Sequence, residues 1–426
     1  MKKRMLCLLP VLLAAGALLY AWRIHRAKEP APLEPVSGRD FMCAALTYDE
    51  GTRTLRGTQT LRAQNRTGEA LEEIVLRLYM NGMDGASTAV SGVTVNGEAA
   101  SFEQDQEDPT VLTIRHPWQT GEEIELKWTV LLRHERTDGA AVVTLPSLAM
   151  RENGAWRTDA YDGLVEPSYG EAFDVVITLD GKVAAQMRMA RDASFALAEK
   201  EAEKEILGVR VHALGRDAGE ARRLLGAVQA ALESLNKAGF AYPFDVLTVA
   251  QRSGQDALSL SGLIALDADL DGEQLHRETA RLLARQIFGV FVESDPWNAP
   301  WLSHTLASCA EMLSYRARKG AAAYEERLYG EMELAGRVTR PAGVCVGAST
   351  AHFGSRQEME QVLCEQGAAM LLGVCEAVGA EAFVTALTLY TEQNAGKTGT
   401  LEALEDALEQ ATGSRWDAYL ADGLSF

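Results

Sequence analysis

The sequence is poor in the residue patterns that build zinc centres. Its seven histidines open no HExxH motif, in which two imidazoles four residues apart share one face of a helix. The nearest approach, His134-Glu135, follows the strand-like run WTVLLR, so we expect it in a solvated hairpin loop. The six cysteines include no CxxC pair, which excludes the usual structural zinc patterns and favours buried free thiols.

The chain also lacks an excess of positive charge. Its 41 Lys and Arg residues stand against 60 Asp and Glu, which gives a net charge of −19. Binding to nucleic acid needs clustered basic residues that neutralise phosphates, so this class of partner is excluded. A length of 426 residues, 47% of them apolar, is enough for two or three domains with substantial cores.

One long uncharged run occurs, near the N-terminus. Lys2-Lys3-Arg4 precede the eighteen residues from Met5 to Trp22, and Arg23 follows them. A run of this length can just cross a bilayer, so residues 1–26 are expected to form a cytoplasmic tip and a single-pass signal anchor. A cleaved signal peptide is the alternative. The body is then expected outside the cytoplasm at the cell membrane, behind a stalk of residues 27–38 that holds three prolines.

The rest of the chain has an α+β pattern in two parts. Residues 39–203 show alternating apolar and polar positions broken by turn signals such as Asn96-Gly97 and Asp180-Gly181, which predicts an antiparallel β-sandwich. Residues 204–426 begin with short strands and a helix over 221–238 and become mostly helical after 271. The further helices are predicted at 272–291, 300–319, 321–337, 356–378, 380–393, 399–411 and 414–422.

The segment from Arg281 to Glu311 carries a family resemblance. It keeps a frame of Gln286, Ser294-Asp295-Pro296, Pro300-Trp301-Leu302 and Leu306-Ala307. This frame resembles the alanyl aminopeptidases (peptidase family M1, gluzincins), in which HExxHQW is followed about a dozen residues later by PWLxEGLA. The stretches 48–82 and 155–179 resemble the β-domain of the same family. The resemblance implies a β-sandwich followed by a thermolysin-like domain.

The metal ligands of that family are replaced here. Arg281, Leu282 and Arg285 stand where the family has its first His, its Glu and its second His, and the third ligand, a Glu, falls on His304. A guanidinium has no lone pair to donate. At about 4 Å and an effective dielectric of about 20, each Arg would also repel a dication by roughly 8 kcal/mol. Neither zinc nor another cofactor is therefore expected.

Two further family positions are altered. Ser259 stands where the family has the Glu that holds the substrate's amino terminus, and Cys364 stands where it has a Tyr that stabilises the tetrahedral intermediate. Because several catalytic positions are replaced together, the resemblance implies a catalytically inactive ectodomain that binds a peptide or protein partner. A structural role in an envelope assembly is one alternative. Residual hydrolysis is another, with Cys364 as nucleophile and His304 as base.

The two arginines leave two interpretations open. They could form internal ion pairs, with Glu278 and Glu311 as candidate partners, or they could receive a carboxylate of a bound peptide in bidentate fashion.

An acidic loop precedes the degenerate zinc segment. Asp267, Asp269 and Asp271, with Gly272 and then Glu278, have the spacing of a calcium-binding loop. The incoming element looks like a strand and not a helix, so we expect Asp271 or a neighbour to cap the following helix. Calcium at these four carboxylates is the alternative.

Overall fold

The computed structural model describes residues 32–83, 85–134, 139–152, 154–161, 163–166, 169–253, 256–337 and 340–425. Nearly all of them belong to one compact unit, Pro35–Phe426. The anchor predicted at 5–22 lies outside the described residues. Among those described, no helix is both long and apolar enough to cross a bilayer.

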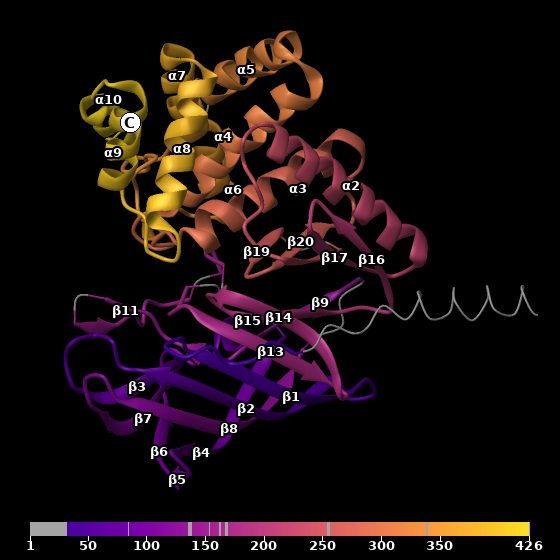
Figure 1. The fold of residues 1–426 in the computed structure, drawn as a ribbon, viewed down its shortest axis with the longest axis vertical. Helices are drawn as coiled ribbons and strands as arrows, with labels where there is room; N and C mark the ends of the chain where they lie inside the picture. Colours follow the sequence, from indigo (N-terminus) through magenta and orange to yellow (C-terminus); the bar gives the residue numbers. More distant parts are fainter. Residues whose placement is uncertain are drawn as a thin grey trace, which may run out of the picture. The chain divides into compact units, whose positions relative to one another are not determined.

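The N-terminal part of this unit consists of two sheets that enclose one apolar core. The larger sheet has the order β14-β13-β1-β2-β8-β4-β5, and the smaller one β10-β3-β7-β6 (Figure 1). Along β8 (Glu123–Arg133) every second residue is buried, as a half-buried strand requires. The other bounds are β1 (Phe41–Asp49), β2 (Thr54–Gln64), β3 (Leu71–Arg77), β4 (Ser87–Val95), β5 (Glu98–Ala99), β6 (Ser101–Gln104), β7 (Val111–Trp118), β10 (Ser147–Leu148), β13 (Phe173–Leu179) and β14 (Lys182–Ala190).

The two turn signals of the sequence close hairpins of the larger sheet. Asn96 and Gly97 have φ values of 53° and 84° between β4 and β5, and Asp180 and Gly181 have 49° and 79° between β13 and β14. Both central residues of each turn are left-handed, which is the backbone that Asn-Gly and Asp-Gly pairs favour. The hairpin predictions are confirmed.

Two short strand pairs complete the N-terminal part. One consists of β9 (Ala141–Leu145) and β15 (Ala193–Leu197), and the other of β11 (Arg151–Glu152) and β12 (Ala155–Trp156). The side chain of His134, just after β8, is buried and stacks on Tyr48 with ring centroids 5.7 Å apart. A solvated His134 is therefore wrong.

A five-stranded sheet lies between the sandwich and the helices in Figure 1. Its order is β16-β17-β18-β20-β19, and β17, β18 and β20 run parallel. The strands are β16 (Lys200–Ile206), β17 (Val209–Gly215), β18 (Val246–Arg252), β19 (Leu258–Leu260) and β20 (Leu263–Asp267), with α2 (Ala218–Lys237) after β17. Because β16 pairs with β17 along its length, this sheet includes residues on both sides of the predicted boundary at 203/204.

Helices fill the remainder, in the ranges that the periodicity predicts. They are α3 (Gly272–Arg285), α4 (Pro300–Lys319), α5 (Ala321–Ala335), α6 (Arg356–Glu360), α7 (Gly367–Val378), α8 (Ala380–Asn394), α9 (Leu401–Thr412) and α10 (Asp417–Ser425). Two π-helical segments, η2 (Gln286–Phe291) and η4 (Gln361–Gln366), continue α3 and α6. Such segments interrupt regular helices at functional sites in many proteins.

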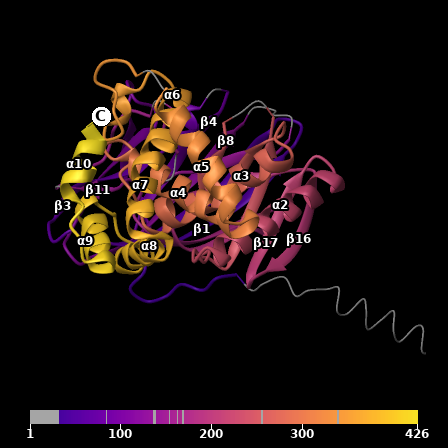
Figure 2. The ribbon, with the colours of Figure 1, turned by 90° about the horizontal axis from the view of Figure 1, so that it is seen from above.

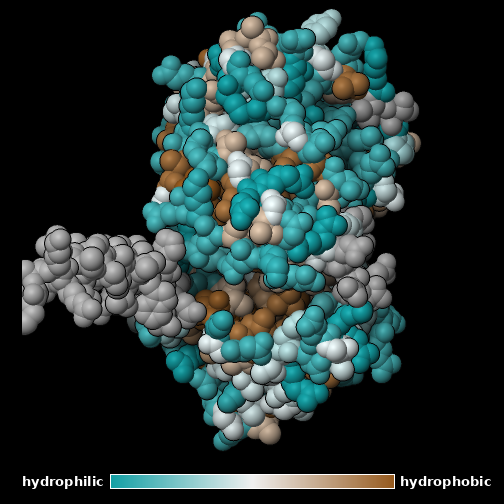
Figure 3. Space-filling view, turned by 90° about the vertical axis from the view of Figure 1, so that its right-hand side faces the viewer, coloured by the Kyte–Doolittle hydropathy of each residue, from teal (hydrophilic) through white to brown (hydrophobic). Residues whose placement is uncertain are grey.

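Helix α4 is the centre of the helical part. It contacts α2, α3, α5 and α7, and Figure 2 shows it among these helices. Its side chains from Pro300 to Ser314 are buried, so this helix is covered on all sides over most of its length. The face seen in Figure 3 is mainly hydrophilic, with apolar residues in a hollow near mid-height and in smaller groups above it.

Candidate functional site

Helix α3 presents Arg281 and Arg285 on one face. The two residues are one helical turn apart, and their side chains are only 12% and 7% exposed. Leu282, which stands where the related family has its catalytic Glu, is fully buried in the apolar core of the helical part. The segment is thus built as a buried helix, and the two guanidiniums must find partners inside the protein.

Arg285 forms a bidentate ion pair with Glu166. Its Nη1 donates to Oε1 of Glu166 at 2.5 Å, and its Nη2 donates to Oε2. Glu166 comes from the loop before β13, and it also accepts from Nη2 of Arg356 on α6 at 3.2 Å. Burial alone would raise the pKa of Glu166, but the charges of Arg285 and Arg356 hold this pKa below its usual range. The carboxylate therefore stays ionised between two cations.

Arg281 belongs to a second, adjoining group of charges. Its Nη2 and Nε donate to the two oxygens of Glu278 at 2.6 and 3.1 Å, and Glu360 lies 3.9 Å from Nη2. Glu360 also accepts from Nε of Arg356 at 3.3 Å. Three arginines and three glutamates thus neutralise one another, so no positive charge is left over to attract a peptide carboxylate.

The ion pairs agree in part with the partners named from the sequence. Arg281 pairs with Glu278, one of the two candidates. The other candidate, Glu311, binds Arg327 at 2.6 and 2.8 Å, so its prediction as a partner of the α3 arginines is wrong.

The structure brings His304 and Cys364 together. Nδ1 of His304 lies 3.7 Å from Sγ of Cys364, and Nη1 of Arg281 donates to the same sulfur at 3.1 Å. Burial, and then the charges of Arg285 and Arg281, hold the pKa of His304 far below its ordinary value. Burial also raises the pKa of Cys364, although Arg281 opposes it. A neutral imidazole beside a protonated thiol is not an activated nucleophile.

Ser259 is joined to the helix and not to open space. Its Oγ donates to the carbonyl of Leu282 at 3.2 Å and accepts from Nε2 of Gln286 at 2.8 Å. Oε1 of Gln286 accepts the backbone N–H of Gly262 at 3.0 Å. Gly262 has φ = 66°, and a Cβ there would lie 2.9 Å from the sulfur of Met187, so this turn requires glycine. These bonds fix the strand β19 against the start of η2.

A cavity of about 20 Å³ remains between these side chains. Glu166, Tyr169, Ser259, Arg285, Ser294 and Ser303 are among its lining residues. The hydroxyl of Tyr169 and Nε of Arg285 are buried there and have no hydrogen-bond partner in the described part of the chain. A space of this size holds about one water molecule, which would satisfy such groups. It is far too small for a peptide.

The side chains present do not fit a zinc ion. Three protein ligands with lone pairs are the minimum of a catalytic zinc site. Of the four residues at the family's ligand and base positions, His304 alone has an acceptor atom, and that imidazole lies beside Cys364. Each of the two arginines donates hydrogen bonds to both carboxylate oxygens of its glutamate partner.

The acidic loop has the geometry of a turn that leads into α3. Oδ1 of Asp267 accepts the N–H of Asp269 at 3.1 Å, and Arg223 donates to the carbonyl of Leu270 at 2.7 Å. Asp271 is the N-cap residue of α3, but its side chain accepts no capping hydrogen bond. Asp271 thus has the predicted position at the start of the helix, but the predicted capping hydrogen bond from its side chain is wrong. The fourth carboxylate of the predicted calcium site, Glu278, is bound to Arg281. Calcium binding at this loop therefore stays a prediction.

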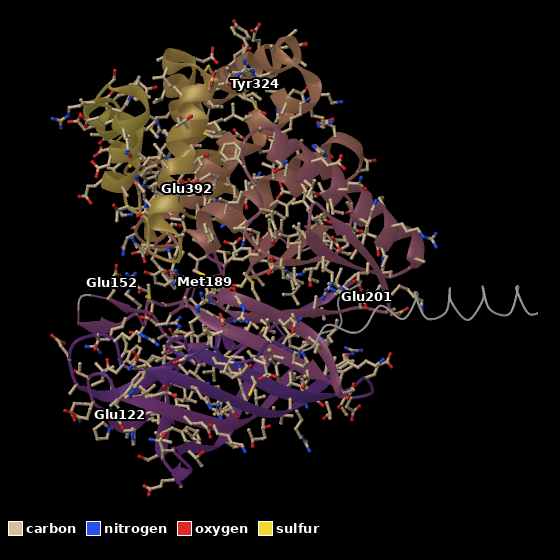
Figure 4. The ribbon with its side chains drawn as sticks, viewed as in Figure 1. Glu122, Glu152, Met189, Glu201, Tyr324 and Glu392 are labelled. Atoms are coloured by element: carbon tan, nitrogen blue, oxygen red, sulfur yellow. The ribbon has the colours of Figure 1, made fainter. Side chains whose placement is uncertain are left out.

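One other group could place three metal-ligand atoms near each other among the described residues. Glu201 and Glu203 on β16 and His212 on β17 have ligand atoms within 4.8 Å of one another. Glu201 lies on the edge strand β16 (Figure 4). Its carboxylate oxygen is 2.8 Å from Nδ1 of His212, within hydrogen-bonding distance. Arg210 approaches Glu203 at 3.6 Å. An exposed ion pair accounts for this group.

Comparisons with known proteins agree with this geometry at the level of the fold. No family model matches the sequence, and no curated protein matches it. Among solved structures, the M1 zinc metallopeptidase from Deinococcus radiodurans is similar, with 20% identity, a TM-score of 0.66 and coverage of 91% of this chain and 92% of that one. The chain has an M1 aminopeptidase-like fold. A mutant of the same enzyme bound to a Tyr-Ser-Ala substrate gives 19% identity and a TM-score of 0.66, with 91% and 94% covered.

Sequence reasoning missed the two residues that complete this site. Glu166 lies 119 positions before Arg285, and Arg356 lies 190 positions after Glu166. No local pattern marks either residue. The available signal was indirect, because two arginines on a helix with a buried leucine between them require a carboxylate from elsewhere in the fold.

Proposed function

We propose that this protein is a catalytically inactive member of the M1 peptidase fold that works as a membrane-tethered binding module outside the cytoplasm. The observation that carries the proposal is the buried bidentate pair between Arg285 and Glu166. It fills the position where the family has its second zinc ligand. Together with the pair between Arg281 and Glu278, it neutralises the charge of the helix face that would otherwise bind metal.

The charge network also connects the two parts of the compact unit. Glu166 precedes β13 of the sandwich, whereas Arg285 and Arg356 belong to helices of the second part. A second buried pair, Arg191 with Glu293 at 3.0 Å, links the end of β14 to the segment after η2. We infer that the residues of the former catalytic site now stabilise the association of the two parts.

Partner binding is then assigned to a surface other than the former cleft. A cavity of about 20 Å³ gives no entry to a peptide. This argues against peptide capture by Arg281 and Arg285, and it argues against hydrolysis by Cys364 and His304, which needs a substrate beside the sulfur.

Metal analysis and a peptidase assay test the proposal. The full-length chain, dialysed against zinc, is expected to hold substoichiometric zinc and to leave amino-acid anilides intact. The matched positive control carries Arg281→His, Leu282→Glu, Arg285→His and His304→Glu, which restores the family's ligands and base. Stoichiometric zinc with turnover in the unaltered chain would refute the proposal.

A further inference from the structure

The β-sandwich carries a groove that the proposed function leaves unassigned. It consists of two adjoining hollows of about 600 Å³ and 230 Å³. Both are lined by Leu71, Arg151 and Trp156, which therefore form a common wall. We name the two hollows together the β11 groove, after the strand of Arg151. In Figure 4 the labelled Glu152 follows Arg151 on β11, and Glu122 lies at the same end of the sandwich, near the end of β7.

The floor of the larger hollow is the outer face of the smaller sheet. Val75 of β3 and Val111 of β7 supply apolar surface there, and Trp156 packs against them. The indole Nε1 of Trp156 donates to the carbonyl of Glu73 at 3.1 Å, which fixes the ring on the sheet. A fixed aromatic wall beside aliphatic floor suits side chains with long apolar stems.

Carboxylates dominate the charge of the groove. Six of them line the hollows against two guanidiniums, those of Arg66 and Arg151; the carboxylates are Asp40, Glu72, Glu73, Asp105, Asp108 and Glu171. Three of the six are already paired: Asp40 with Arg66 at 2.6 Å, Glu73 with Arg115 at 2.5 Å and Asp108 with Arg77 at 4.0 Å, so Glu72, Asp105 and Glu171 supply the unpaired charge. The groove therefore carries a negative potential that attracts a cationic ligand.

Several of these carboxylates have capacity to spare. Glu72, Asp105 and Glu171 form no ion pair within 4.0 Å in the described part of the chain, whereas Oδ2 of Asp108 lies 4.0 Å from Nη2 of Arg77. Glu171 accepts one weak bond, from the N–H of Arg151 at 3.3 Å. Its pKa is raised by burial, as expected for a carboxyl group that lacks a counter-ion.

We propose that the β11 groove binds an extended basic segment of a partner protein, with lysine or arginine side chains on both sides of Trp156. The inference rests on the proposed function, since it supplies the binding surface that a closed cleft cannot. A peptide is favoured over a small polyamine because the hollows combine acidic rims with an apolar floor and an indole. A simple cation has no apolar side chains to pack against the apolar floor and the indole.

A labelled peptide of alternating lysine and leucine, with both ends blocked, is the probe. Its affinity for the full-length chain is measured by fluorescence anisotropy, with a glutamate-leucine peptide of equal length as the negative control. We expect saturable binding of the lysine peptide that weakens as salt rises, because surface charges are screened. Absence of saturable binding would overturn the proposal.

The double variant Glu72→Gln, Glu171→Gln locates the site. Loss of two ion contacts is expected to weaken binding by about tenfold. The matched control, Glu98→Gln with Glu326→Gln, removes the same charge from exposed side chains of strand β5 and helix α5, which do not line the groove, and is expected to change affinity less than about twofold. An equal effect of both double variants, or no effect of the first, would mean that the peptide binds elsewhere and would refute the assignment.

Two further measurements keep the result unambiguous. Competition by free spermidine at the affinity of the peptide would show a polyamine site and overturn the peptide assignment. If thermal melting shows that the double variant is unfolded, Glu72→Gln alone is used, since Glu72 is exposed. Zinc content and turnover are measured on the same samples, so failure of peptide binding and failure of the inactive-peptidase proposal are separate outcomes.

Discussion

The buried network of Arg281, Arg285 and Arg356 and the β11 groove use charge in opposite ways. In the network, these three arginines pair with three glutamates beside a cavity of about 20 Å³, which Glu166 and Arg285 line. In the groove, six carboxylates line hollows of about 600 and 230 Å³, and three of them have no ion pair in the described residues. Buried charges that are paired with one another attract no further ligand. Unpaired charges in an open hollow can attract a ligand of opposite charge. This difference is the physical basis for proposing the groove, and not the buried network, as a binding surface.

Removing the central carboxylate of the closed site has the largest expected effect. Glu166→Gln leaves Arg285 buried without an anion and leaves Arg356 with Glu360 as its nearest carboxylate, and breaking such a buried pair typically costs about 3–5 kcal/mol of unfolding free energy. Thermal or urea unfolding followed by circular dichroism measures this loss.

The control for that variant is the exposed residue Glu123, which is far from the network. Glu123→Gln is expected to change stability by less than about 0.5 kcal/mol. If Glu166→Gln were as stable as the control, the charges at the former site would not hold the two parts together, and the contrast with the groove would disappear.

The second buried pair predicts a pH dependence of the closed region. Burial raises the pKa of Glu293 to about 7, and Arg191 only partly opposes this. A carboxyl with a raised pKa binds more protons in the folded than in the unfolded chain, so its contribution to stability is full below about pH 4.5 and is lost as pH rises through about 7. The side chain of the Glu293→Gln variant stays neutral at every pH. The melting temperature of the variant minus that of the unaltered chain should therefore increase from pH 5 to pH 8.

A constant difference across that range would contradict the assignment of the titration to Glu293. Burial also raises the pKa of Asp192 and of Glu311, so the comparison must be the difference between the two chains at each pH. Below about pH 7 Glu293 is itself protonated in the folded chain, so Arg191 lacks this anion in both chains, and the difference between them grows only as Glu293 ionises.

Sequence periodicity was enough for most of the fold. The α4 helix agrees with its predicted range of 300–319, and both left-handed hairpin turns lie at the predicted Asn-Gly and Asp-Gly pairs. These features depend on neighbours within a few residues. The partners of Arg285 could not be predicted in this way, because Glu166 and Arg356 approach it only after the two parts of the unit have packed. The β11 groove could not be predicted for the same reason, since its residues come from five separate stretches of chain, at 40, 64–75, 105–118, 148–158 and 171.

Reversal of one groove charge sharpens the contrast from the other side. Glu72→Lys places a cation at the rim of the larger hollow, so it should weaken the lysine peptide more than Glu72→Gln does, at low salt. Its melting temperature should stay within the range of other exposed substitutions, about 0.5 kcal/mol, because Glu72 has no ion pair in the described residues. A large loss of stability would mean that Glu72 serves the fold, as Glu166 does, and not a ligand.

Cys364 gives the smallest expected effect and the finest test of the closed site. Its sulfur is 3.1 Å from a guanidinium nitrogen of Arg281, a contact that would lower the pKa of an accessible thiol, yet burial raises the pKa instead. We therefore expect slow alkylation by iodoacetamide at pH 8, slower than at the exposed Cys43, as followed by peptide mass mapping. The Cys43→Ser chain serves as the control for reagent consumption. Cys364→Ala should cost about 1 kcal/mol or less. Rapid alkylation of Cys364 with a midpoint below pH 8 would mean that Arg281 and His304 stabilise a thiolate. The buried site would then hold a nucleophile that small molecules can reach. It would differ from the groove in the size of the ligand that it admits, and not in being closed to ligands.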